Sequence, residues 1–377
     1  MKRILTGLFG LLLAAAAFAD VAVIERHGLA GQTGPNKPKR AGLAGRQQAR
    51  NPGARTLTDA SGLQYFINTD ITFTTSSSAS GAASEASYSG PVNATTSGGG
   101  VTASTLDDAF DGYHALCVSL IGATGPCQSG GGGGQGLGDH GPAPPYLMYN
   151  QNGPATLDGA CSNRQLILPP QLLAGIQVQR KVFVPSTDTF IRWFDTFTNT
   201  TGSTQSVTAI SSNNLGSDSN TEITATSSGD LTVTTADTWV ATFQSYTGTT
   251  SPDVRLGHVL WGPGAPTTLA NSTFVNGDDN PFWAYTFTLA PGETRAILNF
   301  ATGQPSKAAA AAKAAELVGL PDPSIQCLST VEQQQVTNFA PRQSVIEVPT
   351  VSGIGLGAFA LLLAATSFLL LRRRSRI

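Results

Sequence analysis

Four cysteines carry the most readable chemistry in this chain, because their number is even and two of them lie close together. They are Cys117, Cys127, Cys161 and Cys327, and they can pair into two disulfides in three ways. A Cys117–Cys127 bond closes a loop of eleven residues containing Gly and Pro, which makes it the easiest to form. Cys161–Cys327 would then tie the last helix back to the β body. A zinc site needs tighter paired spacing with histidine nearby, and the sequence offers none.

Histidines beside carboxylates are candidates for general acid–base chemistry. The chain has four histidines, at His27, His114, His140 and His258. Aspartates precede two of them in the sequence: Asp107, Asp108 and Asp111 before His114, and Asp139 before His140. A large sandwich of the mutarotase type would place such groups on a concave, sugar-active face. Because no Gly-x-Ser-x-Gly or His-Glu-x-x-His motif accompanies them, we expect scattered surface histidines and no catalytic residue.

Three loops have compositions that could suit a ligand. Residues 276–280 and 213–218 concentrate Asn and Asp in turns, which suits calcium but equally suits a turn without metal. Residues 129–138 are rich in glycine, but no Gly-Lys-Ser/Thr follows, so they do not form a phosphate loop. The sequence therefore predicts no metal site and no cofactor.

Tryptophans offer a further binding chemistry, since aromatic rings on a sheet face can stack on sugars. Trp193, Trp239, Trp261 and Trp283 all fall in predicted strands. A large β core also uses tryptophan for bulk, and we expect these residues to be core. A surface polysaccharide nevertheless remains a candidate partner.

The elements that would position these side chains are predominantly strands. Runs of β-branched and aromatic residues separated by Gly, Asn, Asp or Pro predict strands at 64–73, 178–184, 190–198, 207–210, 221–226, 231–235, 239–246, 256–261, 282–289 and 296–300. Residues 74–105, rich in Ser and Thr, could add edge strands or an exposed insertion. Together they predict a mainly β chain, built as a large antiparallel β-sandwich with one or two C-terminal helices.

Two helices are expected at the end of this body, which spans residues 57–340. Ser306 is a candidate N-cap for an Ala-rich helix over 307–318, with Gly319 suited to its C′ position. Ser329 and Glu332 form a candidate capping box for a second short helix toward Phe339.

The N-terminus resembles a secretory signal peptide. Lys2 and Arg3 precede an apolar run to residue 18, and the small residues Ala17 and Ala19 predict cleavage by signal peptidase between Ala19 and Asp20. Residues 20–56 then form a basic, Gly- and Pro-rich leader that we expect to be disordered. The sequence thus predicts an exported protein.

The C-terminus predicts a membrane anchor. Residues 354–371 carry no charge and are long enough to span a bilayer as a helix. Residues 372–377 contain four arginines, which should stay cytoplasmic and leave the body outside.

A linker over residues 341–353 carries a more specific signal, which extends into the apolar run. Its members are Val348, Pro349, Thr350, Val351 and Ser352, followed by Gly355. With the apolar run and the basic end, this resembles the IPTL-type C-terminal sorting domain of Gram-negative bacteria, with Ile354 where that family prefers Trp. The resemblance implies an exosortase-like membrane transpeptidase as partner, which would cut near the motif. The protein would be anchored in the inner membrane before processing, then reside at the cell surface or outside the cell.

Charge excludes one class of partner. Residues 57–371 contain 9 basic and 22 acidic residues, a net charge of −13, so the body should not bind nucleic acid.

The sequence predicts an exported, anchored surface protein with a structural, adhesive or matrix role. A carbohydrate-binding or sugar-active protein is the alternative, which a line of exposed aromatic residues with paired carboxylates would favour.

Overall fold

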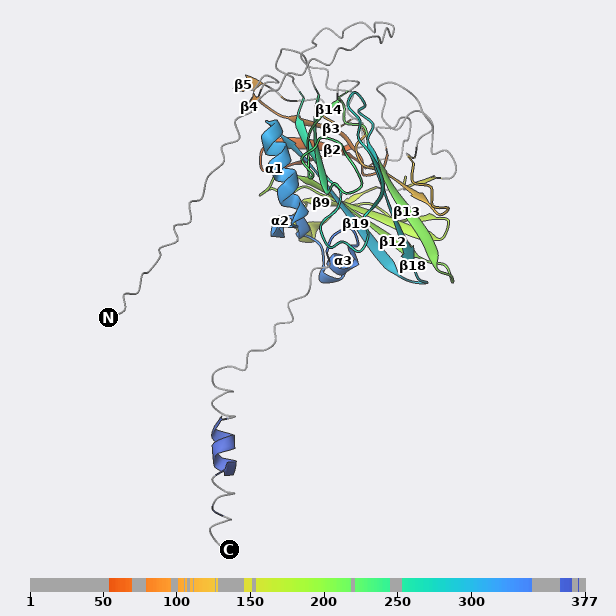
Figure 1. The fold of residues 1–377 in the computed structure, drawn as a ribbon, viewed down its shortest axis with the longest axis vertical. Helices are drawn as coiled ribbons and strands as arrows, with labels where there is room; N and C mark the ends of the chain where they lie inside the picture. The colour runs from red at the N-terminus through yellow and green to blue at the C-terminus, as the bar shows by residue number, and fades with distance from the viewer. Residues whose placement is uncertain are drawn as a thin grey trace, which may run out of the picture.

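The computed structural model describes residues 54–69, 79–95, 101–104, 106, 109–110, 112–125, 127, 146–150, 154–217, 221–244, 253–340, 360–367 and 372. In these ranges the chain is mainly β, and helices follow the last strand. Figure 1 shows α1, α2 and α3 beside the strands. The prediction of a mainly β chain with C-terminal helices is therefore confirmed.

The largest sheet has nine strands, and all of its neighbouring strands pair antiparallel. Its order is β14-β15-β16-β19-β12-β11-β9-β8, with β10 also paired to β11. The strands are β8 (Thr156–Leu157), β9 (Gln165–Ile167), β10 (Gln171–Leu173), β11 (Ile176–Phe183), β12 (Ile191–Asn199), β14 (Thr221–Thr226), β15 (Trp239–Gln244), β16 (Arg255–Val259) and β19 (Thr294–Gln304).

A five-stranded sheet in the order β17-β18-β13-β6-β7 packs on one face of the nine-stranded sheet. Its strands are β6 (Ala115–Ser119), β7 (Leu147–Met148), β13 (Gln205–Ser212), β17 (Leu269–Thr273) and β18 (Phe282–Leu289). Phe197 of β12 lies 5.5 Å from Phe287 of β18, measured between ring centroids. The main hydrophobic core lies between these two sheets, as in other face-to-face sheet packings.

Two small sheets complete the β structure of the described residues. Strands β1 (Ala54–Thr58), β2 (Leu63–Asn68) and β3 (Ala83–Tyr88) form one, and β4 (Val92–Thr95) and β5 (Val101–Ser104) form the other. Leu63 and Tyr65 of β2 belong to the main core. The Ser/Thr-rich segment thus contributes short strands rather than only an insertion.

The centre of the nine-stranded sheet is buried on both faces. Successive side chains of a strand point to opposite faces, and in β12 both sets are covered. Trp193 and Phe197 join the core between the sheets, whereas Phe194 joins a second cluster with Leu317 and Phe339. A helix layer therefore covers the face that the five-stranded sheet leaves free.

Helix α1 (Lys307–Val318) has the predicted bounds, and the Ser306 hydroxyl accepts a hydrogen bond from the Ala309 amide at 3.1 Å. The expectation for Gly319 is wrong in detail. Gly319 is right-handed at φ −78°, and Leu320 takes the left-handed position at φ +50°. Leu320 is buried in the second cluster, so its side chain packs in the core from this left-handed position.

Helix α3 (Thr330–Gln335) has the predicted capping box between Ser329 and Glu332. It ends at Gln335, before Phe339, because Val336 is extended and forms a β-bridge with Ala296 of β19. The Thr337 amide donates to the Ala296 carbonyl at 2.9 Å. A one-turn helix, α2 (Asp322–Ile325), lies between α1 and α3 and was not predicted.

Two other expectations need correction or restriction. The predicted strand at 231–235 is wrong, because these residues form an exposed bend between two aspartates whose carboxylates accept backbone hydrogen bonds, Asp230 and Asp237. Of the predicted strand at 64–73, residues 70–73 lie outside the described ranges.

The predicted membrane span at 354–371 is described only over 360–367, which is helical. Across the described ranges, we find no helix with the length and apolar character to cross a membrane.

The contact between α1 and β16 depends on a glycine and generates a first prediction. A Cβ atom at Gly257 would lie 2.7 Å from the Ala310 carbonyl oxygen and 3.0 Å from the Ala314 Cβ. We expect Gly257→Ala to lower the free energy of unfolding by about 1–3 kcal/mol, since backbone must move to make room. Urea denaturation measures the change. Gly202→Ala is the control, because nothing lies within 4 Å of that position; equal effects of the two substitutions would contradict the packing argument.

Candidate functional site

A buried polar network joins the two large sheets. The Asp195 carboxylate on β12 binds Arg180 on β11 through Nε at 2.7 Å and Nη2 at 2.8 Å. His114, just before β6, approaches the same carboxylate with Nε2 at 3.3 Å. Its Nδ1 lies 2.6 Å from the Ser211 hydroxyl on β13. We call these four residues the Asp195 network.

Electrostatics fix the protonation of the Asp195 network. Burial lowers the pKa of His114 to about 4, and the nearby Arg180 charge adds to this, while the hydrogen bond to Asp195 opposes it. Burial raises the pKa of Asp195, but the charge and hydrogen bonds of Arg180 outweigh burial and leave that pKa lowered. At neutral pH the imidazole is therefore neutral. Because the carboxylate can only accept, Nε2 carries the proton and Nδ1 accepts from Ser211.

Serine, histidine and aspartate in hydrogen-bonded order are the residue types of nucleophilic acyl transfer. Here, however, Ser211 is 2% exposed and His114 and Asp195 are 1% exposed. The cavity beside them leaves only about 10 Å³ open to the centre of a water molecule, enough for one water. A substrate cannot reach the serine in this conformation, so the network links the sheets rather than forming an open active site.

His258 is the second buried histidine. Its Nδ1 lies 2.7 Å from the Tyr113 hydroxyl and its Nε2 lies 2.8 Å from the Thr242 hydroxyl. Burial lowers its pKa to about 3. The expectation of surface histidines is therefore wrong for His114 and His258, because each ring nitrogen finds a partner inside. His27 and His140 lie outside the described ranges, as do Asp107, Asp108, Asp111 and Asp139.

The tryptophans largely follow the core expectation. Trp193 and Trp283 are fully buried. Trp239 and Trp261 are partly buried and pack against the two hydrophobic clusters. The Trp261 indole donates to the Asp237 carbonyl at 2.9 Å. No line of exposed tryptophans forms on the described surface.

Both disulfides form in the pairing that loop closure favoured. Cys117–Cys127 has a Cα–Cα distance of 6.1 Å, and Cys161–Cys327 has one of 5.6 Å. Cys161 ends a short 3-10 helix (Gly159–Cys161), and Cys327 lies between α2 and α3. The second bond therefore joins the helix layer to the connection between β8 and β9 of the nine-stranded sheet.

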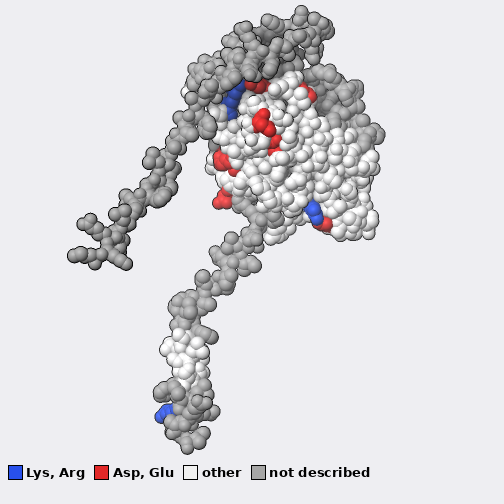
Figure 2. Space-filling model, in the orientation of Figure 1, with Lys and Arg blue, Asp and Glu red and all other residues white. Residues whose placement is uncertain are grey.

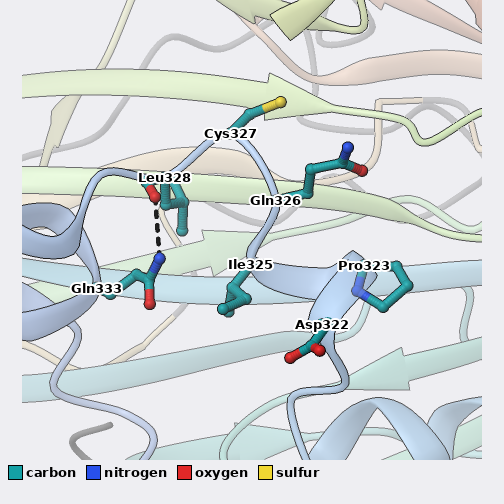
Figure 3. A pocket seen from close by; sticks show the side chains of 7 residues that line it. All are labelled: Asp322, Pro323, Ile325, Gln326, Cys327, Leu328 and Gln333. Atoms are coloured by element: carbon teal, nitrogen blue, oxygen red, sulfur yellow. Dashed lines mark hydrogen bonds between the residues drawn. The ribbon is translucent and has the colours of Figure 1, made fainter. Parts of the chain in front are cut away.

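A surface hollow of 460 Å³ lies beside this second disulfide (Figure 3). Its lining residues are Asp322, Pro323, Ile325, Gln326, Cys327, Leu328 and Gln333. The Gln333 side chain donates to the Leu328 carbonyl at 2.9 Å. The sequence did not indicate this hollow, because it depends on helix α2 next to Cys327, which no sequence pattern predicted.

Arg192, on strand β12 of the sheet, binds the main chain of the residues that line that hollow. Its Nη1 donates to the Ser324 carbonyl at 2.9 Å and to the Gln326 carbonyl at 2.7 Å. Nη2 donates to the Gln165 side-chain oxygen at 2.9 Å. Burial lowers the pKa of this guanidinium to about 9, so it remains charged at neutral pH.

The oxygen-rich loops use their side chains for turns. The Asn276 side-chain oxygen accepts from the Ile223 amide at 2.7 Å, and Asp278 accepts from the Asn280 amide at 3.0 Å. Asn213 accepts from the His114 amide at 2.8 Å. Within the described ranges, no group of three or more His, Cys, Asp or Glu residues is placed to hold a metal. Asp218 and residues 129–138 are outside those ranges.

Surface charge agrees with the acidic sequence count, and acidic side chains outnumber basic ones on the face in Figure 2. Arg180, Arg192 and Arg255 are fully buried. Four other cations pair with carboxylates, in Lys181–Glu332, Arg295–Glu293, Lys307–Glu222 and Lys313–Asp188. The described surface therefore offers little cationic area to a polyanion.

The trafficking residues predicted from the sequence all lie outside the described ranges. They are Ala19 and Asp20 at the expected signal cleavage, and Val348, Pro349, Thr350, Val351, Ser352 and Gly355 of the expected sorting motif. They remain predictions.

Comparison with known proteins assigns no family. No family model and no curated protein matches the chain. Among solved structures, a polysaccharide lyase has a TM-score of 0.37 at 11% identity, over 66% of this chain and 34% of that one. A TPR-domain containing protein from Parabacteroides distasonis has 0.38 at 11%, over 67% and 47%. A putative kojibiose phosphorylase from the human microbiome has 0.35 at 10%, over 73% and 38%. At these TM-scores the similarities support no functional argument, and the chain spans less than half the length of each.

The buried histidines predict that the protein loses stability in mild acid. In the unfolded chain a histidine titrates near pH 6.5, whereas His114 and His258 resist protonation until about pH 4 and 3. Between those values the unfolded state binds more protons, so stability is full above pH 6.5 and falls as pH decreases. Each histidine should contribute a loss of up to about 1.4 kcal/mol per pH unit. Urea denaturation at pH 7 and pH 5 checks this. His258→Gln should roughly halve the slope, and stability unchanged between the two pH values would refute the prediction.

The Asp195–Arg180 pair generates a third prediction. Asp195→Asn removes the negative charge and leaves the buried guanidinium unbalanced, which should cost about 3–5 kcal/mol of unfolding free energy. Thermal and urea denaturation measure it. The matched control is Glu293→Gln, which weakens the pair with Arg295, whose two side chains are each about one-third exposed, and should cost no more than about 1 kcal/mol. Similar losses of unfolding free energy in both variants would contradict the prediction that the buried pair costs more to break than the exposed one.

Proposed function

We propose that this chain is an exported bacterial cell-surface protein with a structural or adhesive role, held at the envelope by its C-terminal segment until a sorting enzyme processes it. The observation that carries the proposal is the pair of disulfides, which together use all four cysteines. Such bonds form and persist in oxidising compartments outside the cytoplasm. This agrees with the signal peptide predicted before Asp20.

The end of the body is suited to a C-terminal attachment. Residues 336–339 are bound to the nine-stranded sheet directly before the predicted linker. The Asn338 side chain accepts from the Leu298 amide at 2.8 Å and donates to the Leu298 and Leu260 carbonyls at 2.7 and 2.9 Å. A load arriving through residue 340 would therefore enter the body at a well-bonded point.

The body favours a structural over a catalytic role, because its most reactive arrangement, the Asp195 network, is buried. The carbohydrate alternative would need exposed aromatic rings, and Trp193 and Trp283 are in the core. A glycan array on the full chain tests that alternative. Specific binding abolished by Trp261→Ala, a change at one of the two partly buried tryptophans, would replace the structural proposal with a lectin.

Processing is tested by intact-mass measurement of the protein expressed in a Gram-negative host that has an exosortase. We expect a mature chain that starts at Asp20 and ends near residues 348–352. Replacing Pro349 and Thr350 with alanine should trap the longer form in the membrane fraction, because apolarity drives insertion whereas the motif is read separately.

The outcomes separate the parts of the proposal. A wild-type chain that keeps its full C-terminus in that host would refute sorting and leave only the anchor. A body found in the cytoplasm would refute both. The control variant is Gln343→Ala, which lies in the same linker but outside the motif and should leave processing unchanged.

A further inference from the structure

The two disulfides occupy different environments. Cys117 and Cys127 are 0% exposed and lie within a buried cluster on the five-stranded sheet. Cys161 is 5% exposed, whereas Cys327 is only partly buried. The second bond therefore has one residue that reaches the surface, whereas both residues of the first bond are enclosed.

The approach to Cys327 is through a shallow hollow that is open to solvent. The 460 Å³ hollow has Cys327 in its lining, with Ile325 and Leu328 as apolar neighbours and Gln326 and Gln333 as polar ones (Figure 3). Its wall is held in place from the sheet by the two hydrogen bonds from Arg192 to the carbonyls of residues 324 and 326. The hollow is large enough for a small organic molecule.

We propose that Cys327 is a thiol-exchange site for small dithiols, and that Cys161–Cys327 is the disulfide of this protein that can be reduced in the folded state. A dithiol thiolate attacks the Cys327 sulfur, forms a mixed disulfide with it and displaces Cys161 as a thiolate. The second thiol of the reagent, as its thiolate, then attacks the reagent's own sulfur in the mixed disulfide and displaces Cys327 as a thiolate. The reagent leaves as a cyclic disulfide, oxidised by two electrons, and the protein is reduced by two.

Reduction should loosen one part of the molecule. Besides the disulfide, α2 and its flanks are held by the Arg192 bonds, and α3 by Lys181–Glu332. The strand pairing within the sheets and the buried Cys117–Cys127 bond do not involve residues 321–335. The reduced protein should therefore stay folded while residues 321–335 open more often.

The test is timed reduction of the oxidised full-length chain with dithiothreitol at neutral pH without denaturant. Free thiols are trapped with N-ethylmaleimide and located by peptide mass mapping. We expect Cys161 and Cys327 to be labelled at least about tenfold faster than Cys117 and Cys127, at a rate proportional to dithiol concentration, as direct attack requires. Hydrogen exchange of the reduced protein should rise over residues 321–335 and not in the sheets.

Two variants separate access from stability. Gln326→Trp fills the hollow and should slow reduction of Cys161–Cys327 by roughly fivefold or more, because accessibility limits attack. Gln334→Trp adds the same side chain at an exposed position that does not line the hollow, and should leave the rate within about twofold. Equal reduction rates for both disulfides, a rate independent of dithiol concentration, or equal effects of the two tryptophans would overturn the proposal.

Discussion

The packing of the two large sheets depends on the buried ion pair between the Asp195 carboxylate and the Arg180 guanidinium. Arg180 and Asp195 are direct cross-strand partners in the β11–β12 pair. A slip of one residue would turn one of the two side chains to the opposite face of the sheet. The ion pair therefore selects the register of the central strands. Arg180 also donates to the His114 carbonyl at 2.6 Å, which extends the same interaction to the five-stranded sheet.

The other face of the nine-stranded sheet uses the same principle with different groups. Arg192 lies three residues before Asp195 on β12, so its side chain points to the helix layer. There it binds main-chain carbonyls rather than a carboxylate, and its guanidinium carbon lies 4.6 Å from the centre of the Phe183 ring. Asn338 supplies the second attachment of the C-terminal segment. Buried polar side chains thus define where each layer is placed, while the hydrophobic clusters supply most of the burial.

Local features were predictable from the sequence because their causes lie within a few residues. The bounds of α1 follow from the Ser306 cap and the alanine run, and the start of α3 follows from Ser329 and Glu332. The Cys117–Cys127 bond follows from its short loop. The burial of His114 was not predictable in this way, because its partners Ser211 and Asp195 are 97 and 81 residues away in sequence. Residues 231–235 alternate like a strand, yet backbone hydrogen bonds to the Asp230 and Asp237 carboxylates hold them in an exposed bend.

The two disulfides differ in how strongly they constrain the unfolded chain, because they close loops of very different length. Loop-closure entropy assigns roughly 3 kcal/mol to the eleven-residue Cys117–Cys127 loop and roughly 5 kcal/mol to a loop with the 166-residue separation of Cys161–Cys327. The second bond thus constrains the unfolded chain more, although it lies nearer the surface. It also shortens the covalent path between the helix layer and the sheet. The chain leaves the described body after residue 340, only thirteen residues beyond Cys327, so whatever is attached beyond that point is connected to the sheet through this bond as well as through Asn338.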